Sequence, residues 1–160
     1  MLVTLEILRE TILHGVKLQA HYFGEYAKEG GDSVAVLTQA NDSDDDILNK
    51  FIQTSAARVI DILTPYLKTA EYSEGDSIVE DELLSKFVYT LDLPAGFDKN
   101  QMLLESIKDY MINYTLFRWC VMTKKNEAGI YEDEMKRSVS GLIKRVNQRN
   151  GPVRRKMQPF

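Results

Sequence analysis

The chain has 160 residues, 44% of them hydrophobic and 28% charged, with a net charge of −4, as is ordinary for a globular protein of one domain. Its single cysteine excludes an internal disulfide and favours a reducing compartment. No apolar run reaches the roughly 18 residues of a membrane span, and Glu6, Arg9 and Glu10 interrupt the N-terminal apolar run, so we expect neither a membrane protein nor a secreted one.

The first predicted element is a helix over residues 4–28. Its apolar residues recur at the spacing of one helix face: Leu5, Leu8, Ile12, Val16, Ala20, Phe23 and Ala27. Gly15 and Gly24 each weaken a helix by roughly 1 kcal/mol relative to alanine, so a kink or break is expected there. Residues 33–40 fit a short helix and an ordered loop equally well.

A second helix is predicted to begin within residues 41–46, where Ser43 and Asp46 have the spacing of a capping box. Its apolar residues form one face: Leu48, Ile52, Ala56, Val59, Leu63 and Tyr66. Pro65 disfavours helical backbone at Thr64, so the helix should end or kink at that point.

Residues 70–97 differ in character and are predicted to be an acidic loop with a strand insertion. Residues 72–82 are acidic, whereas residues 86–93 alternate and are rich in β-branched and aromatic side chains. One face of this strand holds Phe87, Tyr89 and Leu91. Because one strand is not stable alone, we expect a partner strand near residues 77–84 or from another subunit.

A helix over residues 102–123 is predicted to be the centre of the fold, because no other segment offers as much apolar surface. Its stripe contains Leu103, Ile107, Tyr110, Met111, Tyr114, Phe117 and Val121. The aromatic residues expected in the core are Tyr110, Tyr114, Phe117, Trp119 and, from the next helix, Tyr131. Cys120 lies in the same segment and is expected to be buried rather than nucleophilic.

The last helix is predicted over residues 127–148, as an antiparallel hairpin with the central helix. Its stripe contains Tyr131, Met135, Val139, Leu142 and Val146. The predicted fold class is therefore mainly α: a small helical bundle of four to five helices with a short β-strand or hairpin insertion. Residues 1–150 should form a single helical domain, and residues 151–160 a flexible basic C-terminal tail.

The charges are divided unevenly along the chain. Residues 135–160 contain eight Lys or Arg and no Asp or Glu, which leaves a charge of −12 on residues 1–134 once this +8 is taken from the net −4. A basic segment on an acidic body is typical of proteins that bind partners. Helix C-termini favour cations, but this does not explain Arg154, Arg155 and Lys156, which follow Gly151-Pro152.

No pattern in the sequence indicates catalysis or a metal site. His14 and His21 share a helix face but lack a second cluster of ligands. Three carboxylates resemble the first half of a calcium loop: Asp42, Asp44 and Asp46. The loop's sixth and twelfth positions would be Ile47 and Gln53, where glycine and glutamate are needed. We therefore expect no catalytic residues, no metal, no cofactor and no enzymatic activity.

Several segments together are similar to one known family. They are DDDILNKFIQTSAARVIDILTPYL, then LDLPAGF, a helix ending in YTLFRWCVMT, the turn KNEAGIY, and LIKRVNQRNGPVRRK. Their order and character, over residues 44–156, resemble the head–tail connector (adaptor, neck) proteins of tailed bacteriophages and prophages.

The resemblance implies a non-enzymatic structural subunit of a ring that joins capsid to tail around the DNA channel. Its partners would be a portal protein or equivalent ring, other neck or tail proteins and further copies of itself, with DNA passing without sequence-specific binding. It would be found in the virion neck, or in the host cytoplasm before assembly. The segment expected to dock on the portal contains Arg149, Val153, Arg154, Arg155, Lys156, Met157 and Phe160.

The alternative is a nucleic-acid-binding helical module that acts through the basic last helix and tail. The acidic body argues against this alternative, because nucleic-acid-binding domains are normally basic overall.

Overall fold

The computed structural model describes residues 1–27, 44–71, 85–94, 97, 99–123 and 128–147, with the backbone alone at 23–27, 70 and 71. The elements in chain order are β1 (Leu2–Leu8), α1 (Arg9–Ala27), α3 (Asp45–Leu63), the 3-10 turn η3 (Thr64–Tyr66), β2 (Leu67–Glu71), β3 (Lys86–Asp92), α4 (Asn100–Thr123) and α5 (Ala128–Val146). The predicted class is confirmed, since the described part of the chain is mainly helical with one small antiparallel sheet.

The N-terminal segment is a strand, so the predicted helix over residues 4–28 was wrong in its first turn. In β1 the side chains of Val3, Leu5 and Ile7 are buried and those between them are exposed, which is the period of a strand. Helix α1 starts only at Arg9 and then runs as one helix to Ala27, so the break expected at Gly15 or Gly24 is absent.

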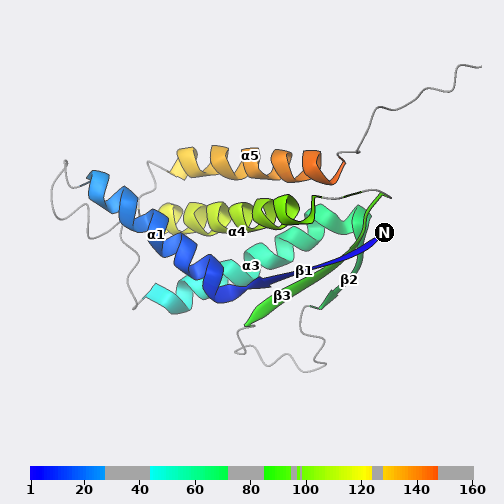
Figure 1. Ribbon diagram of the computed structural model, residues 1–160. Helices are drawn as coiled ribbons and strands as arrows, with labels where there is room; N and C mark the ends of the chain where they lie inside the picture. Colours follow the sequence, from blue (N-terminus) through cyan, green and yellow to red (C-terminus); the bar gives the residue numbers. More distant parts are fainter. Residues whose placement is uncertain (28–43, 72–84, 95–96, 98, 124–127, 148–160) are drawn as a thin grey trace, which may run out of the picture.

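Gly15 has a packing role rather than a role in bending. A Cβ atom at Gly15 would lie 2.6 Å from Ile112 Cδ1, so the missing side chain allows α1 to approach α4 closely. On the same helix Ile12, Val16 and Ala20 are buried, as the helical stripe predicted. Figure 1 shows α1 crossing α4 at an angle after it leaves the sheet.

The sheet has the strand order β1-β3-β2, and both outer strands are antiparallel to β3. The prediction that β3 pairs near residues 77–84 or with another subunit was wrong: β3 lies between two strands of its own chain, and residues 77–84 lie outside the described residues. The face that holds Phe87, Tyr89 and Leu91 is buried, as predicted. The side chain of Tyr89 joins the sheet to α3, because its hydroxyl donates to the carbonyl oxygen of Ala56 at 3.2 Å.

Helix α3 presents the predicted buried face of Leu48, Ile52, Ala56, Val59 and Leu63. It ends at Leu63, and Pro65 lies in the 3-10 turn that follows, which confirms the predicted end. The N-cap is Asp44, while Ser43 of the expected capping box lies outside the described residues. Lys17 of α1 forms an ion pair with Asp45 at 2.7 Å, which fixes the start of α3 against α1.

Helix α4 lies between α5 on one side and α3 with the sheet on the other (Figure 1), as predicted for a central helix. Because neighbours surround it, its buried residues do not form the single predicted stripe. They are Leu103, Ser106, Ile107, Tyr110, Met111, Thr115, Leu116, Trp119 and Cys120. Val121, predicted to lie on the stripe, is exposed.

Helix α5 packs almost wholly against α4 as its antiparallel neighbour, which confirms the predicted hairpin (Figure 1). Leu142 and Val146 are buried, and Tyr131, Met135 and Val139 are partly buried against the core.

Candidate interaction surfaces

The aromatic residues of the predicted core lie along α4 and the start of α5. Tyr110 and Trp119 are buried, and Tyr114, Phe117 and Tyr131 are half-buried. Burial, followed by the nearby Tyr114, raises the pKa of Tyr110 to about 12. The indole N–H of Trp119 is buried and has no acceptor among the described residues.

Most of the basic side chains on α5 have partners within the protein. Lys136 lies 2.7 Å from Glu132, and Arg137 lies 2.6 Å from Glu134. Arg145 donates to the main-chain oxygen of Met102 on α4 at 3.3 Å. This helix therefore does not present a continuous row of unpaired cations.

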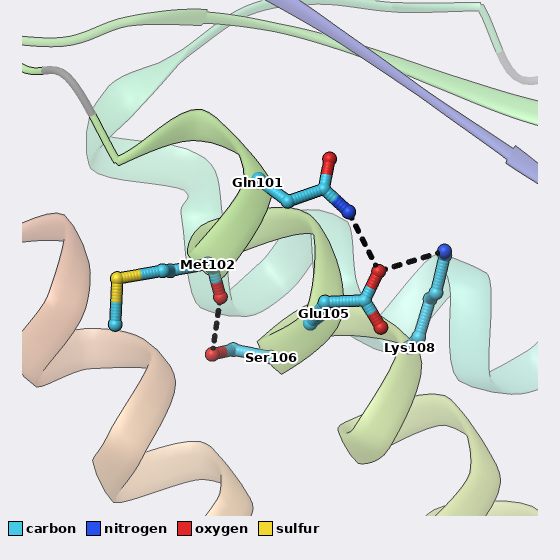
Figure 2. Close-up of polar contacts among 5 residues, drawn as sticks. All are labelled: Gln101, Met102, Glu105, Ser106 and Lys108. Atoms are coloured by element: carbon cyan, nitrogen blue, oxygen red, sulfur yellow. Dashed lines mark hydrogen bonds and ion pairs between the residues drawn. The ribbon is translucent and has the colours of Figure 1, made fainter.

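A small network of hydrogen bonds stabilises the N-terminal end of α4, as Figure 2 shows. Glu105 accepts hydrogen bonds from Gln101 and Lys108, each at 3.0 Å, and Ser106 donates to the main-chain oxygen of Met102 at 2.8 Å. In Figure 2 the side chain of Met102 extends toward the neighbouring helix. Burial, followed by the charge of Glu105, raises the pKa of Asp109.

Two further contacts fix the position of α5. Asn113 of α4 donates to Ser138 Oγ at 2.8 Å, which ties the middle of the hairpin. At its end, Asn147 accepts a hydrogen bond from the hydroxyl of Tyr66, the last residue before β2. The described chain therefore ends beside the start of β2.

The residues predicted to dock on a portal all follow Asn147 and lie outside the described residues: Arg149, Val153, Arg154, Arg155, Lys156, Met157 and Phe160. Their proposed role stays a prediction.

The described residues considered for metal binding do not form a site. No group of three or more His, Cys, Asp and Glu within the described residues has the geometry to hold a metal ion. His14 and His21 are both exposed, and Asp42 of the calcium-like pattern lies outside the described ranges. Cys120 is buried, as predicted. Within the same ranges, no helix combines the length and apolar character needed to cross a membrane.

The two edges of the sheet differ, and neither was predicted from the sequence. Edge strand β2 has five residues, contains Lys68 and has an irregular register between Leu67 and Thr69. Edge strand β1 has seven residues in continuous register with β3 and contains neither proline nor lysine. The available signal was the alternation of Val3, Leu5 and Ile7 beside a strand at 86–93 that needed a partner.

Comparison of the chain with models of protein families, with curated proteins and with solved structures found no match in any of the three. Its function is therefore inferred from its own residues.

Proposed function

We propose that this protein is a structural head–tail connector (adaptor) subunit, which docks on a portal-like ring and helps to join capsid and tail around the DNA channel. It acts by binding other proteins and is not an enzyme. Before assembly it would be in the host cytoplasm, as a monomer or a weak oligomer, and afterwards in the virion neck. Its partners are a portal-like ring, other neck or tail proteins and, in the particle, further copies of itself.

The observation that supports this proposal is the difference between the basic residues of α5 and those that follow it. On α5, Lys136 and Arg137 pair with carboxylates of the same helix. No Asp or Glu follows Glu134, so the cations after Asn147, including Arg154 and Arg155, have no acidic neighbours in the sequence. A short basic and apolar segment attached to an acidic, folded body suits docking on the surface of a protein.

The hydrogen bond between Tyr66 and Asn147 fixes the residue after which the basic segment begins. A peptide that orders on binding loses conformational entropy, so each docking site would have modest affinity. Repetition around a ring would then supply the necessary strength through avidity.

The test is co-purification with the portal protein of the same virus. We expect Arg154→Ala/Arg155→Ala, and deletion of residues 151–160, to abolish co-purification and to leave the melting temperature unchanged. The matched control is Lys136→Ala/Arg137→Ala, which also removes two positive charges but only from ion pairs within α5. Equal loss in both double variants would mean that net charge alone drives binding, which contradicts a specific docking segment.

The same proteins distinguish the nucleic-acid-binding alternative. A module that bound through its last helix and tail would bind DNA tightly, with an affinity that falls steeply as salt rises. We expect weak binding to DNA in a gel-shift series at increasing salt. Tight, strongly salt-dependent binding that both double variants weaken would favour the alternative function.

A further inference from the structure

We propose that β1 is a self-association edge, along which two copies of the chain pair antiparallel about a two-fold axis to form one six-stranded sheet. This inference does not rest on the proposed function.

The β1 edge lacks the prolines, lysines and bulges that normally protect an edge strand. Proteins block such edges with short strands, bulges, prolines or lysines. The β2 edge has three of these, namely its five residues, Lys68 and the irregularity next to it. The β1 edge, with the sequence LVTLEIL in regular register, has none of them, and its one charged side chain, Glu6, lies 3.7 Å from Lys86 of β3.

The backbone hydrogen bonds between β1 and β3 show which groups of β1 face outward. Met1 and Leu93 exchange two hydrogen bonds, of 2.8 and 2.9 Å, and Arg9 donates to the main-chain oxygen of Ser85 at 3.0 Å. Because such pairs alternate along an antiparallel ladder, the odd-numbered residues of β1 direct their N–H and C=O groups to β3. The groups of Leu2, Thr4 and Glu6 therefore point to the outer edge, where no strand of the described chain lies.

A second copy of the chain fits this edge, because the strand is complementary to itself. With Leu5 opposite Leu5 of the second copy, Leu2 faces Leu8 of that copy, and Thr4 faces its Glu6. Leu2 and Leu8 are 55% and 51% exposed in the single chain, and this pairing would cover both of them on one face of the sheet. All seven residues of β1 would be paired, as an isologous contact requires.

Other registers between β1 and β1 of the second copy should be less stable than the one with Leu5 opposite Leu5. A shift of two residues one way places Thr4 opposite Thr4 and Leu2 opposite Glu6, so Leu2 and Leu8 no longer face each other. A shift of two the other way places Glu6 opposite Glu6, where like charges repel. A shift of one residue would place Thr4 and Glu6 opposite odd-numbered residues of the second copy, whose N–H and C=O groups already point to its own β3.

The size of the contact predicts a weak dimer. A strand of seven residues is about 23 Å long, and pairing along one edge buries much less than the roughly 800 Å² per partner of a standard interface. We therefore expect monomers at low concentration, with dimers at concentrations from about 10 μM to 1 mM.

The experiment is sedimentation velocity over a range of concentrations, with hydrogen exchange on the same samples. The outward-facing amides of Thr4 and Glu6 should gain protection as concentration rises, whereas those of Leu5 and Ile7 should be protected throughout. A chain that stays monomeric up to about 1 mM would overturn the proposal.

Two variants test the edge and the register. Thr4→Pro removes an outward N–H that β3 does not use, so the monomer should keep its circular dichroism while dimerisation weakens at least about tenfold. A lysine blocks an edge when no acidic side chain faces it, but in this register Thr4→Lys lies opposite Glu6 of the second copy at two symmetric positions. Dimerisation should therefore strengthen about three- to tenfold.

Thr69→Lys is the matched control, because Thr69 and Thr4 both pair with Thr90 in one row, on opposite edges of the sheet. It should leave dimerisation unchanged. If Thr4→Lys weakens the dimer, the register is wrong, and if Thr69→Lys has the same effect as Thr4→Lys, the edge is wrong. Should Thr4→Pro fail to fold, the two lysine variants still decide both points.

Discussion

Replacement of Gly15 by alanine tests the closest approach between two helices of the fold. A Cβ atom at this position would lie 2.6 Å from Ile112 Cδ1 and 3.3 Å from its Cγ1. Comfortable contacts between carbon atoms are about 3.5–4.0 Å, so Cδ1 would have to retreat by about 1 Å. Alanine favours a helix by about 1 kcal/mol over glycine, whereas overpacking costs about 1–3 kcal/mol. We expect Gly15→Ala to lower the free energy of unfolding by about 0–2 kcal/mol.

A double-mutant cycle separates these two effects. Ile112→Val removes the clashing Cδ1 and alone should cost about 0.5–1.5 kcal/mol. With Gly15→Ala added, the new methyl group fills the space and the gain in helix propensity remains. The double variant should therefore be more stable than the sum of the single effects predicts, by about 1–2 kcal/mol.

The assay is urea unfolding followed by far-ultraviolet circular dichroism, analysed for changes in midpoint at constant slope. Gly141→Ala in α5 is the control, because nothing apart from the adjacent residues and backbone of its own helix lies within 4 Å of a Cβ placed there. It should stabilise the protein by up to about 1 kcal/mol. The close packing of α1 on α4 would be refuted by two results together. The effects of Gly15→Ala and Ile112→Val on the free energy of unfolding would be strictly additive, and Gly15→Ala would stabilise the protein as much as Gly141→Ala does.

Three further predictions concern side chains on α4. Trp119 is only 8% exposed, so Trp119→Ala should cost about 3–5 kcal/mol, and tryptophan fluorescence that is red-shifted and easily quenched would contradict this burial. The pKa of Tyr110 is raised from 10.0 to about 12. The unfolded chain therefore loses the phenolic proton first, and stability should fall by up to about 2–3 kcal/mol as pH rises from 10 to 12. Tyr110→Phe should remove this part of the pH dependence in alkaline unfolding titrations. The folded state raises the pKa of Asp109 and so opposes its ionisation. Asp109→Asn should then raise the melting temperature at pH 7 by about 1–2 °C, and the difference should disappear below pH 3.8, where the carboxyl is protonated in both states; an equal gain at both pH values would point to another cause.

The helices α3, α4 and α5 could be predicted from the sequence because their signals are local. The buried face from Leu48 to Leu63 repeats at helical spacing, and Pro65 marks the end of α3. The hairpin of α4 and α5 follows from the short connection between two long apolar helices. The prediction failed at Val121 because a single stripe was assumed for a helix that has neighbours on several sides.

The sheet could not be predicted in the same way, because its pairings join distant parts of the chain. The segment before Arg9 fits both a strand, through Val3, Leu5 and Ile7, and a helix, through the spacing of Leu5 and Leu8. The choice between these patterns depends on β3, which follows about 80 residues later in the chain. Strand β2 has no clear β signature of its own and forms because β3 offers it a second edge.

The difference between local and distant signals also explains what was missed at the candidate surfaces. The charged tail is visible in composition alone, so the sequence identified it, although its residues lie outside the described ranges. The β1 edge exists only once β3 is placed beside it. The seven residues of β1 are complementary to themselves in sequence. This predicts pairing only once the structure shows which of their backbone groups point away from β3.

The two proposals make a joint prediction, because one edge is unable to serve both a closed pair and a ring. A two-fold pair uses the same surface on both copies and closes, whereas neighbours in a ring meet through two different surfaces. If both proposals hold, pairing along β1 belongs to the protein outside the particle and competes with assembly by mass action. Thr4→Pro, which blocks pairing, should then leave co-purification with the portal protein unchanged or increase it, whereas loss of residues 151–160 should abolish it. A Thr4→Pro protein that folds as a monomer but no longer binds the portal would show instead that the β1 edge is itself the docking surface.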